Sequence, residues 1–317
     1  MRRTAIAALL FSAAACASSG SPPADPMVAA PAIPSPPEGL TPSVQQIVDA
    51  SPADAWRALD PENTLYMDFP QKDGKVGRVI IEMAPDFSPN HVANVKALSR
   101  EGFFVNGAVT RVQDNFVSQW AQAAEPPRPP RVGVEKLKAE FTRPIGDLPF
   151  TVLPDPDTYG VTVGFTNSMP AARANGQTWL VHCYGMVGAG REEDVDSGGG
   201  TELYAIIGQA PRALDRQLSM VGRVVKGMEI LAALPRGTGA AGFYESPAEY
   251  TRYADMKLAA DVPEAQRTNM EVMRTDSDAF ATLVNARRWR KDGFYTNPPG
   301  RIDLCSVPIP AREIKAR

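Results

Sequence analysis

The chain has 317 residues, of which 44% are hydrophobic, so it can bury a core and is not a wholly disordered protein. Its 33 basic and 36 acidic side chains give a formal net charge of −3, which argues against nucleic-acid binding as the main function. With only two histidines and three cysteines, a Cys/His metal site is not expected. The length suggests one or two domains.

Residues 1–16 have the pattern of an export signal. Arg2 and Arg3 precede an apolar stretch at 4–15 that is too short for a membrane span of about 20 residues. Ala13–Ala15 before Cys16 resembles the lipobox of bacterial lipoproteins, which would make Cys16 the lipidated first residue of the mature chain. Ordinary signal-peptidase cleavage beside it is the alternative. Either route predicts a periplasmic or envelope protein, and lipidation would tether it to the outer membrane.

A linker and a helical lead-in follow the signal. Residues 17–40 are rich in Pro and Ser, a composition typical of an extended tether. Residues 41–61 form the lead-in, because Thr41-Pro42 favours a helix over 44–48 and Ser51-Pro52 favours a second short helix through Ala58.

From 62 to 260 the patterning is mainly β. Alternating or β-branched runs predict strands at 64–69, 77–83, 109–112, 116–120, 161–165, 178–184, 202–208, 220–225 and 256–260. Helices are predicted over 91–99 and 227–234, and His91 is expected on a helix surface. Residues 121–159 are Pro-rich and read as irregular. Many short strands with two short helices indicate a closed barrel rather than a Rossmann sheet.

The C-terminal extension, 261–317, predicts a helix over 276–290 with Phe280, Leu283 and Val284 on one face. Packing of this helix against the barrel is the simplest role, and partner docking is the alternative. Cys183 and Cys305 would both lie in an oxidising compartment if the chain is exported, but the sequence does not give their separation, so pairing stays open.

The stretch from Gly102 to Gln119 is the most informative. Gly102-Phe103-Phe104 is followed by Arg111, Phe116 and Gln119 in an Arg-x4-Phe-x2-Gln spacing. Three other segments occur in order around it: 77–95, Asn175–Val181 and 213–228. Together the four segments resemble the signature motifs of the cyclophilins, the peptidyl-prolyl cis-trans isomerase family, over residues 62–260.

The resemblance implies a closed eight-stranded antiparallel barrel with two short helices, here carrying helical N- and C-terminal extensions. It also implies isomerisation of X-Pro bonds. Amide resonance gives these bonds a barrier of about 18–20 kcal/mol, and uncatalysed exchange takes tens to hundreds of seconds. No metal or other cofactor is needed, because any group that favours the twisted amide accelerates the reaction.

By the same resemblance, Arg111 donates to the prolyl nitrogen of the twisted amide and Gln119 orients Arg111. The residues aligned with the substrate pocket are Phe116, Val117, Thr178, Leu180, Leu214 and Leu218. Leu180 stands in place of the family's pocket Phe and Thr178 in place of its active-site Gln, which predicts reduced or altered activity.

Three functions remain open. The first is an exported isomerase, expected to be a monomer, that acts on Pro-containing segments of unfolded envelope proteins. The second is a catalytically weak module that binds such segments as a chaperone or scaffold. The third is a structural envelope lipoprotein.

Two further sites are each interpreted as structural. His182 more simply packs in the core than flanks the pocket. The acidic run 192–196 is a solvated loop rather than a calcium site, since it lacks EF-hand spacing.

Overall fold

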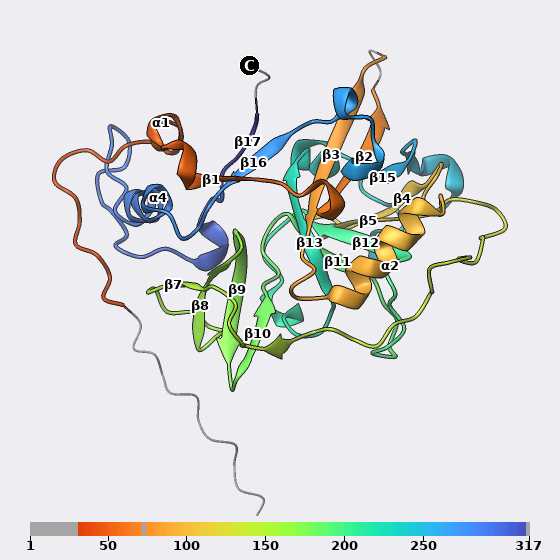
Figure 1. The fold of residues 1–317 in the computed structure, drawn as a ribbon, viewed down its shortest axis with the longest axis horizontal. Helices are drawn as coiled ribbons and strands as arrows, with labels where there is room; N and C mark the ends of the chain where they lie inside the picture. Colours follow the sequence, from red (N-terminus) through yellow and green to blue (C-terminus); the bar gives the residue numbers. More distant parts are fainter. Residues whose placement is uncertain (1–30, 72–73, 315–317) are drawn as a thin grey trace, which may run out of the picture.

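The computed structural model describes residues 31–71 and 74–314, so the predicted signal, Cys16 and much of the linker lie outside the described residues. Within the described ranges, strands form three sheets (Figure 1). The α-helices of this part are α1 (Val44–Ala50), α2 (Pro89–Arg100), α3 (Met228–Ala232) and α4 (Asp278–Arg288). No helix of the described part has the length and apolar character needed to cross a bilayer.

The largest sheet has nine antiparallel strands among the described residues. In spatial order they are β14 (Thr251–Arg252), β4 (Ala108–Val112), β5 (Val117–Ala121), β12 (Glu202–Ile206), β11 (Met186–Ala189), β13 (Met220–Lys226), β3 (Val76–Met83), β2 (Thr64–Pro70) and β15 (Met256–Leu258). Seven of the expected strands therefore form in this sheet, within two residues at each end, as β2, β3, β4, β5, β12, β13 and β15.

The sheet curls into a half-barrel, so the expected closed eight-stranded barrel is wrong. Its edge strands, β14 and β15, do not pair with each other among the described residues. The physical reason is local: β14 is two residues long, and directly after it the backbone runs from the β4 side of the sheet to β2. The Tyr253 N–H donates to the Gly107 carbonyl at 3.1 Å, and the Ala254 N–H donates to the Asp68 carbonyl at 3.0 Å.

One face of this sheet packs on α2 around a large apolar core. The helix buries Val92, Val95 and Leu98, the stripe expected from their helical spacing, against residues such as Ile81 and Trp120. Each such side chain contributes roughly 1.5–3 kcal/mol on burial. This core supports the β4–β5 hairpin, because Val109, Val112 and Trp120 of the hairpin are part of it.

A second sheet is inserted between β5 and β11. Its strands are β6 (Arg143–Pro144), β10 (Gln177–Leu180), β9 (Met169–Ala174), β8 (Thr162–Thr166) and β7 (Thr151–Leu153). The expectation of an irregular 121–159 is wrong where β6 and β7 form. β9 and β10 turn at Asn175-Gly176, whose φ values of 51° and 71° suit a tight hairpin.

The third sheet joins the lead-in to the C-terminal extension through β1 (Trp56–Ala58), β16 (Met270–Met273) and β17 (Ala311–Glu313). The expected second helix through Ala58 is therefore wrong: a single turn at Ala53–Ala55 gives way to β1, because Trp56–Ala58 pair with β16. The extensions are mixed α and β rather than helical.

The C-terminal extension packs against the rest of the chain, as its apolar helix face predicts. Phe280 of α4 meets Phe165 of β8 edge to face at 5.0 Å, and Arg288 forms a buried ion pair with Asp155 at 2.5 Å. Cys183 and Cys305 form a disulfide with a Cα–Cα distance of 5.0 Å, which answers the question that the sequence left open.

Candidate active site

The β4–β5 hairpin places Arg111 opposite Gln119. The two residues are register partners, next to a β-bulge between Val109 and Arg111, and Arg111 Nη1 donates to Gln119 Oε1 at 3.2 Å. The sequence spacing of eight residues thus becomes a direct side-chain contact, because a short hairpin fixes its own register.

Glu202 of β12 completes the chain of contacts. Gln119 Nε2 donates to Glu202 Oε2 at 2.6 Å. Because a carboxylate only accepts hydrogen bonds, it holds the amide group of Gln119 against it and leaves Oε1 facing Arg111. Sequence reasoning missed Glu202 because nothing in its local sequence marks it as the neighbour of Gln119.

The guanidinium of Arg111 also contacts the 241–243 segment, Gln113 and Phe116. Its Nε donates to the Ala241 carbonyl at 2.7 Å and its Nη2 to Gln113 Oε1 at 2.5 Å. Its Cζ lies 5.6 Å from the ring centre of Phe116 and 5.0 Å from that of Phe243. Each Nη still carries a second hydrogen that these contacts do not use.

Burial lowers the pKa of Arg111 below its usual value, and the charge of Glu202 opposes that shift. Since an arginine titrates far above neutrality, Arg111 remains a cation at physiological pH. A partly buried cation with unused N–H groups is a strong hydrogen-bond donor.

Arg111 lines a cleft of about 740 Å³. Six of the eight residues expected at the site line this cleft: Arg111, Phe116, Val117, Gln119, Leu214 and Leu218. Glu202, Tyr204 and Phe243, which the sequence did not point to, line it as well. The cleft therefore combines a fixed cation with an apolar wall.

Thr178 and Leu180 do not line the cleft, and their expected place there is wrong. Both lie in β10, where Leu180 is 2% exposed and Thr178 Oγ1 donates to the Ala172 carbonyl at 3.1 Å. The residues 143–180 fold as a separate sheet, so β10 never becomes a neighbour of β5.

β12 takes that place beside β5, with Gln119 opposite Tyr204 in the register. β12, and not the segment Asn175–Val181, is therefore the neighbour of β5. In this register Tyr204 lies opposite Gln119, and Glu202 and Tyr204 both line the cleft.

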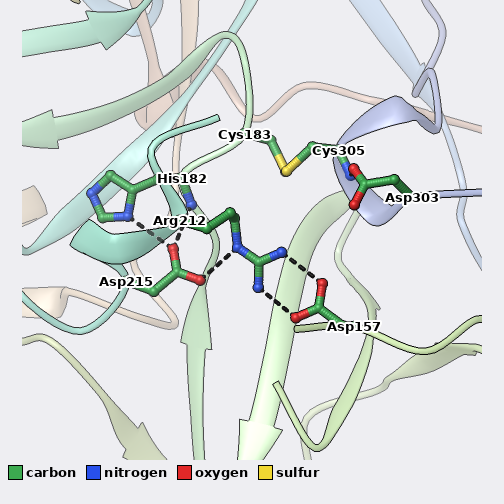
Figure 2. The surroundings of a disulfide bond; sticks show 7 residues. All are labelled: Asp157, His182, Cys183, Arg212, Asp215, Asp303 and Cys305. Atoms are coloured by element: carbon green, nitrogen blue, oxygen red, sulfur yellow. Dashed lines mark hydrogen bonds and ion pairs between the residues drawn. A yellow bond between two sulfur atoms is a disulfide. The ribbon is translucent and has the colours of Figure 1, made fainter. Parts of the chain in front are cut away.

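A buried network lies behind Tyr204, and Figure 2 shows its members His182, Asp215, Arg212 and Asp157. His182 is fully buried, with Nε2 3.1 Å from Tyr204 Oη and Nδ1 3.1 Å from Asp215 Oδ1. Arg212 Nε donates to Asp215 Oδ2 at 2.7 Å, and its two Nη atoms donate to both oxygens of Asp157. His182 thus packs in the core and also contacts the pocket lining.

The charges in this network shift one another's pKa. Burial alone would raise the pKa of Asp215, but hydrogen bonds from His182 and the charge and hydrogen bond of Arg212 outweigh it, and the net shift is downward. The pKa of Asp157 is lowered for the same reason, with burial opposed by hydrogen bonds from Arg212, Tyr159 and Gly160.

The structure also places two other features that the sequence singled out. His91 is buried rather than on the helix surface, because its ring contacts Glu140 Oε2 at 2.6 Å and the Gly198 carbonyl at 3.0 Å. The acidic run 192–196 is an exposed loop at the rim of the cleft, and the described residues hold no group of three His, Cys, Asp or Glu side chains suited to a metal ion.

Comparison with known proteins identifies relatives of this arrangement. Residues 66–251, more than half of the chain, match the family model described as cyclophilin type peptidyl-prolyl cis-trans isomerase/CLD. Proteins named probable peptidyl-prolyl cis-trans isomerase from Brucella suis and Brucella melitensis are 28% identical over 183 residues, 58% of this chain and 76% of theirs. The crystal structure of cyclophilin AquaCyp293 from Hirschia baltica matches with a TM-score of 0.65 and 25% identity, over 83% of this chain and 94% of that one.

Proposed function

The chain belongs to the family of cyclophilin-type peptidyl-prolyl cis-trans isomerases, and on this basis we propose that its Arg111 cleft accelerates X-Pro isomerisation in unfolded exported proteins. The observation that carries the proposal is the chain of contacts from Glu202 through Gln119 to Arg111, which ends at an apolar cleft.

Arg111 acts on the twisted amide. As the C–N bond rotates, the prolyl nitrogen loses conjugation and its lone pair becomes a hydrogen-bond acceptor, which an unused Nη–H of Arg111 can meet. This bond exists only in the twisted state, so it lowers the barrier rather than strengthening substrate binding.

The magnitudes show that Arg111 does not act alone. An acceleration of about 10⁴ requires about 5.4 kcal/mol. A charge-assisted hydrogen bond supplies about 1.5–3 kcal/mol. The rest comes from holding the proline ring and its carbonyl in place, which is the role of the apolar wall formed by Phe116, Val117, Leu214 and Leu218 together with the ring of Tyr204.

The compartment is part of the proposal. A disulfide between Cys183 and Cys305 fits an oxidising compartment, in agreement with the export pattern of residues 1–16. Lipidation of Cys16 would tether the enzyme to the outer membrane through the Pro- and Ser-rich linker. Intact-mass measurement of the protein from membranes tests this: a diacylglyceryl adduct that Cys16→Ser abolishes supports the anchor, and an unmodified mature chain rejects it.

The isomerase activity is tested by NMR exchange spectroscopy of a short Ala-Pro peptide with the mature chain. The wild type should accelerate cis/trans exchange, and Arg111→Ala should reduce kcat/KM by about 10- to 150-fold, the loss of one charge-assisted hydrogen bond. Arg252→Ala is the matched control, because Arg252 is exposed on β14 beside β4 and does not line the cleft. Exchange at the spontaneous rate with the wild type would reject the proposal.

A second candidate is a module that binds Pro-containing segments without catalysis. It is favoured by the contacts that already engage Arg111, above all the Ala241 carbonyl and the ring of Phe243. In the same experiment, peptide signals that broaden while exchange stays at the spontaneous rate identify this second function.

A further inference from the structure

A second cavity, of about 500 Å³, lies away from the Arg111 cleft, between β13, α4 and the segment 304–309 that carries Cys305. Its wall combines apolar and polar surface, and Met186, Met228, Val307 and Ile309 are among its apolar lining residues. The charged side chains that line it are Arg223 and Arg287, and no Asp or Glu of the described residues does so. The isomerase reaction proposed above uses none of these residues.

Arg223 of β13 is 7% exposed and incompletely paired. Its Nε lies 3.5 Å from Glu82 Oε2, and its Nη2 is buried without a hydrogen-bond partner among the described residues. The other oxygen of Glu82 accepts from Arg57 Nη1 at 2.5 Å. One carboxylate thus faces two guanidinium groups, of which Arg57 is about a third exposed and Arg223 is buried.

Arg287 of α4 adds a second incompletely paired cation. Its Nε is buried and has no hydrogen-bond partner within the part of the chain that the structure describes. Buried guanidinium groups are normally paired with carboxylates or other anions, because an unpaired buried charge is strongly unfavourable. Arg223 is such a group, and the half-buried Arg287 brings a second positive charge to the same cavity wall, so the site favours an anionic ligand.

The size and lining of the cavity define the ligand further. Ligand pockets of about 300–1,000 Å³ are mostly apolar, with a few polar groups that fix orientation. A free phosphate would satisfy the arginines but leave the apolar wall against water. We propose that this cavity binds a carboxylate attached to an apolar chain, with the carboxylate on Arg223 and Arg287 and the chain against Met186, Met228 and Ile309.

The test uses the mature wild-type chain labelled with ¹³C at the methionine methyl groups, since Met186 and Met228 report from the cavity wall. Titration with hexanoate should shift both methyl signals saturably. Hexanamide, which lacks the charge, and inorganic phosphate, which lacks the chain, should each bind at least about tenfold more weakly. Equal binding of hexanamide or of phosphate overturns the proposal, and so does the absence of hexanoate binding.

Variants assign the arginines. Arg223→Met and Arg287→Met should each weaken hexanoate binding at least about tenfold. Arg287 is the safer variant for folding, because it is only half-buried whereas Arg223 is packed between strands. Arg301→Met is the control, since Arg301 is exposed and does not line the cavity, and it should bind hexanoate as the wild type does. Unchanged binding by Arg287→Met would refute the assignment.

Discussion

His182 Nε2 lies 3.1 Å from Tyr204 Oη. A fully buried residue outside the cleft therefore contacts a side chain that lines the cleft. If Nδ1–H donates to Asp215, then Nε2 is the acceptor and the Tyr204 hydroxyl donates to it. Asp215 directly follows Leu214, another lining residue. His182 therefore connects Tyr204 and Asp215 from behind the wall of the cleft.

We expect His182 to act as a positioning residue through Tyr204. His182→Asn keeps a group near Asp215 but cannot reach Tyr204, and Tyr204→Phe removes the hydroxyl while keeping the ring. Each should lower kcat/KM by about 2- to 10-fold, mainly by raising KM, because each removes one hydrogen bond that holds the pocket in shape. In a double-mutant cycle the second change should add little to the first.

His91→Asn is the control for that cycle. His91 is equally buried, but its ring contacts Glu140 and Gly198 rather than a pocket aromatic. Its effect on kcat/KM, whatever its size, should add to that of Tyr204→Phe. Additive effects for His182→Asn and Tyr204→Phe would show that His182 only stabilises the fold.

Glu202 should determine the orientation of the Gln119 amide. In Glu202→Ala the amide loses its acceptor and is free to turn its NH₂ group toward Arg111, so kcat should fall by about 2- to 10-fold with little change in KM. Glu202→Gln still offers an acceptor oxygen and should stay close to the wild type. Steady-state exchange measurements check both, and Glu192→Ala at the cleft rim should leave kcat unchanged. A loss in Glu202→Gln as large as in Glu202→Ala would contradict the orienting role.

The disulfide should stabilise the fold substantially. Cys183 and Cys305 are 122 residues apart in sequence, and the chain-entropy estimate for a loop of that size is about 4–5 kcal/mol. Guanidinium denaturation with and without dithiothreitol measures the difference, which should approach this value. The Cys183→Ser/Cys305→Ser double variant should resemble the reduced wild type and no longer respond to dithiothreitol. Equal stability of oxidised and reduced protein would show that the cross-link contributes nothing.

Asp157 should contribute stability that depends on pH. Its folded-state pKa lies below the ordinary value of 3.8, so its contribution is complete above about pH 4 and is lost as the pH falls further toward the folded-state pKa. Asp157→Asn should lower the free energy of unfolding at pH 7 by about 1.5–3 kcal/mol and flatten the pH dependence below pH 4.

Asp276→Asn is the matched control for Asp157. The pKa of Asp276 is also lowered, chiefly by its hydrogen bond with Arg274, but that pair is about half exposed. Its substitution should cost less than about 1 kcal/mol. Thermal denaturation between pH 2.5 and 7 measures both variants, and equal losses would refute a special role for the buried Arg212–Asp157 pair.

Elements that depend on nearby residues could be predicted from the sequence. The apolar spacing of Val92, Val95 and Leu98 indicated α2, and the β-branched runs indicated most strands of the large sheet. The strand at Gln177–Leu180 was also recognised, but its partners were not. A strand pattern states which residues face the core and does not state which other strand lies beside it.

The sequence by itself determined the family and the Arg111–Gln119 pair, because a hairpin sets its own register from a few adjacent residues. The tertiary structure alone decided that Glu202 meets Gln119 across 83 residues, that His182 backs Tyr204, and that Thr178 and Leu180 are excluded from the cleft. These contacts join segments that are distant along the chain. Their pairing follows from how the inserted sheet and the half-barrel pack together, which no local spacing of residues encodes.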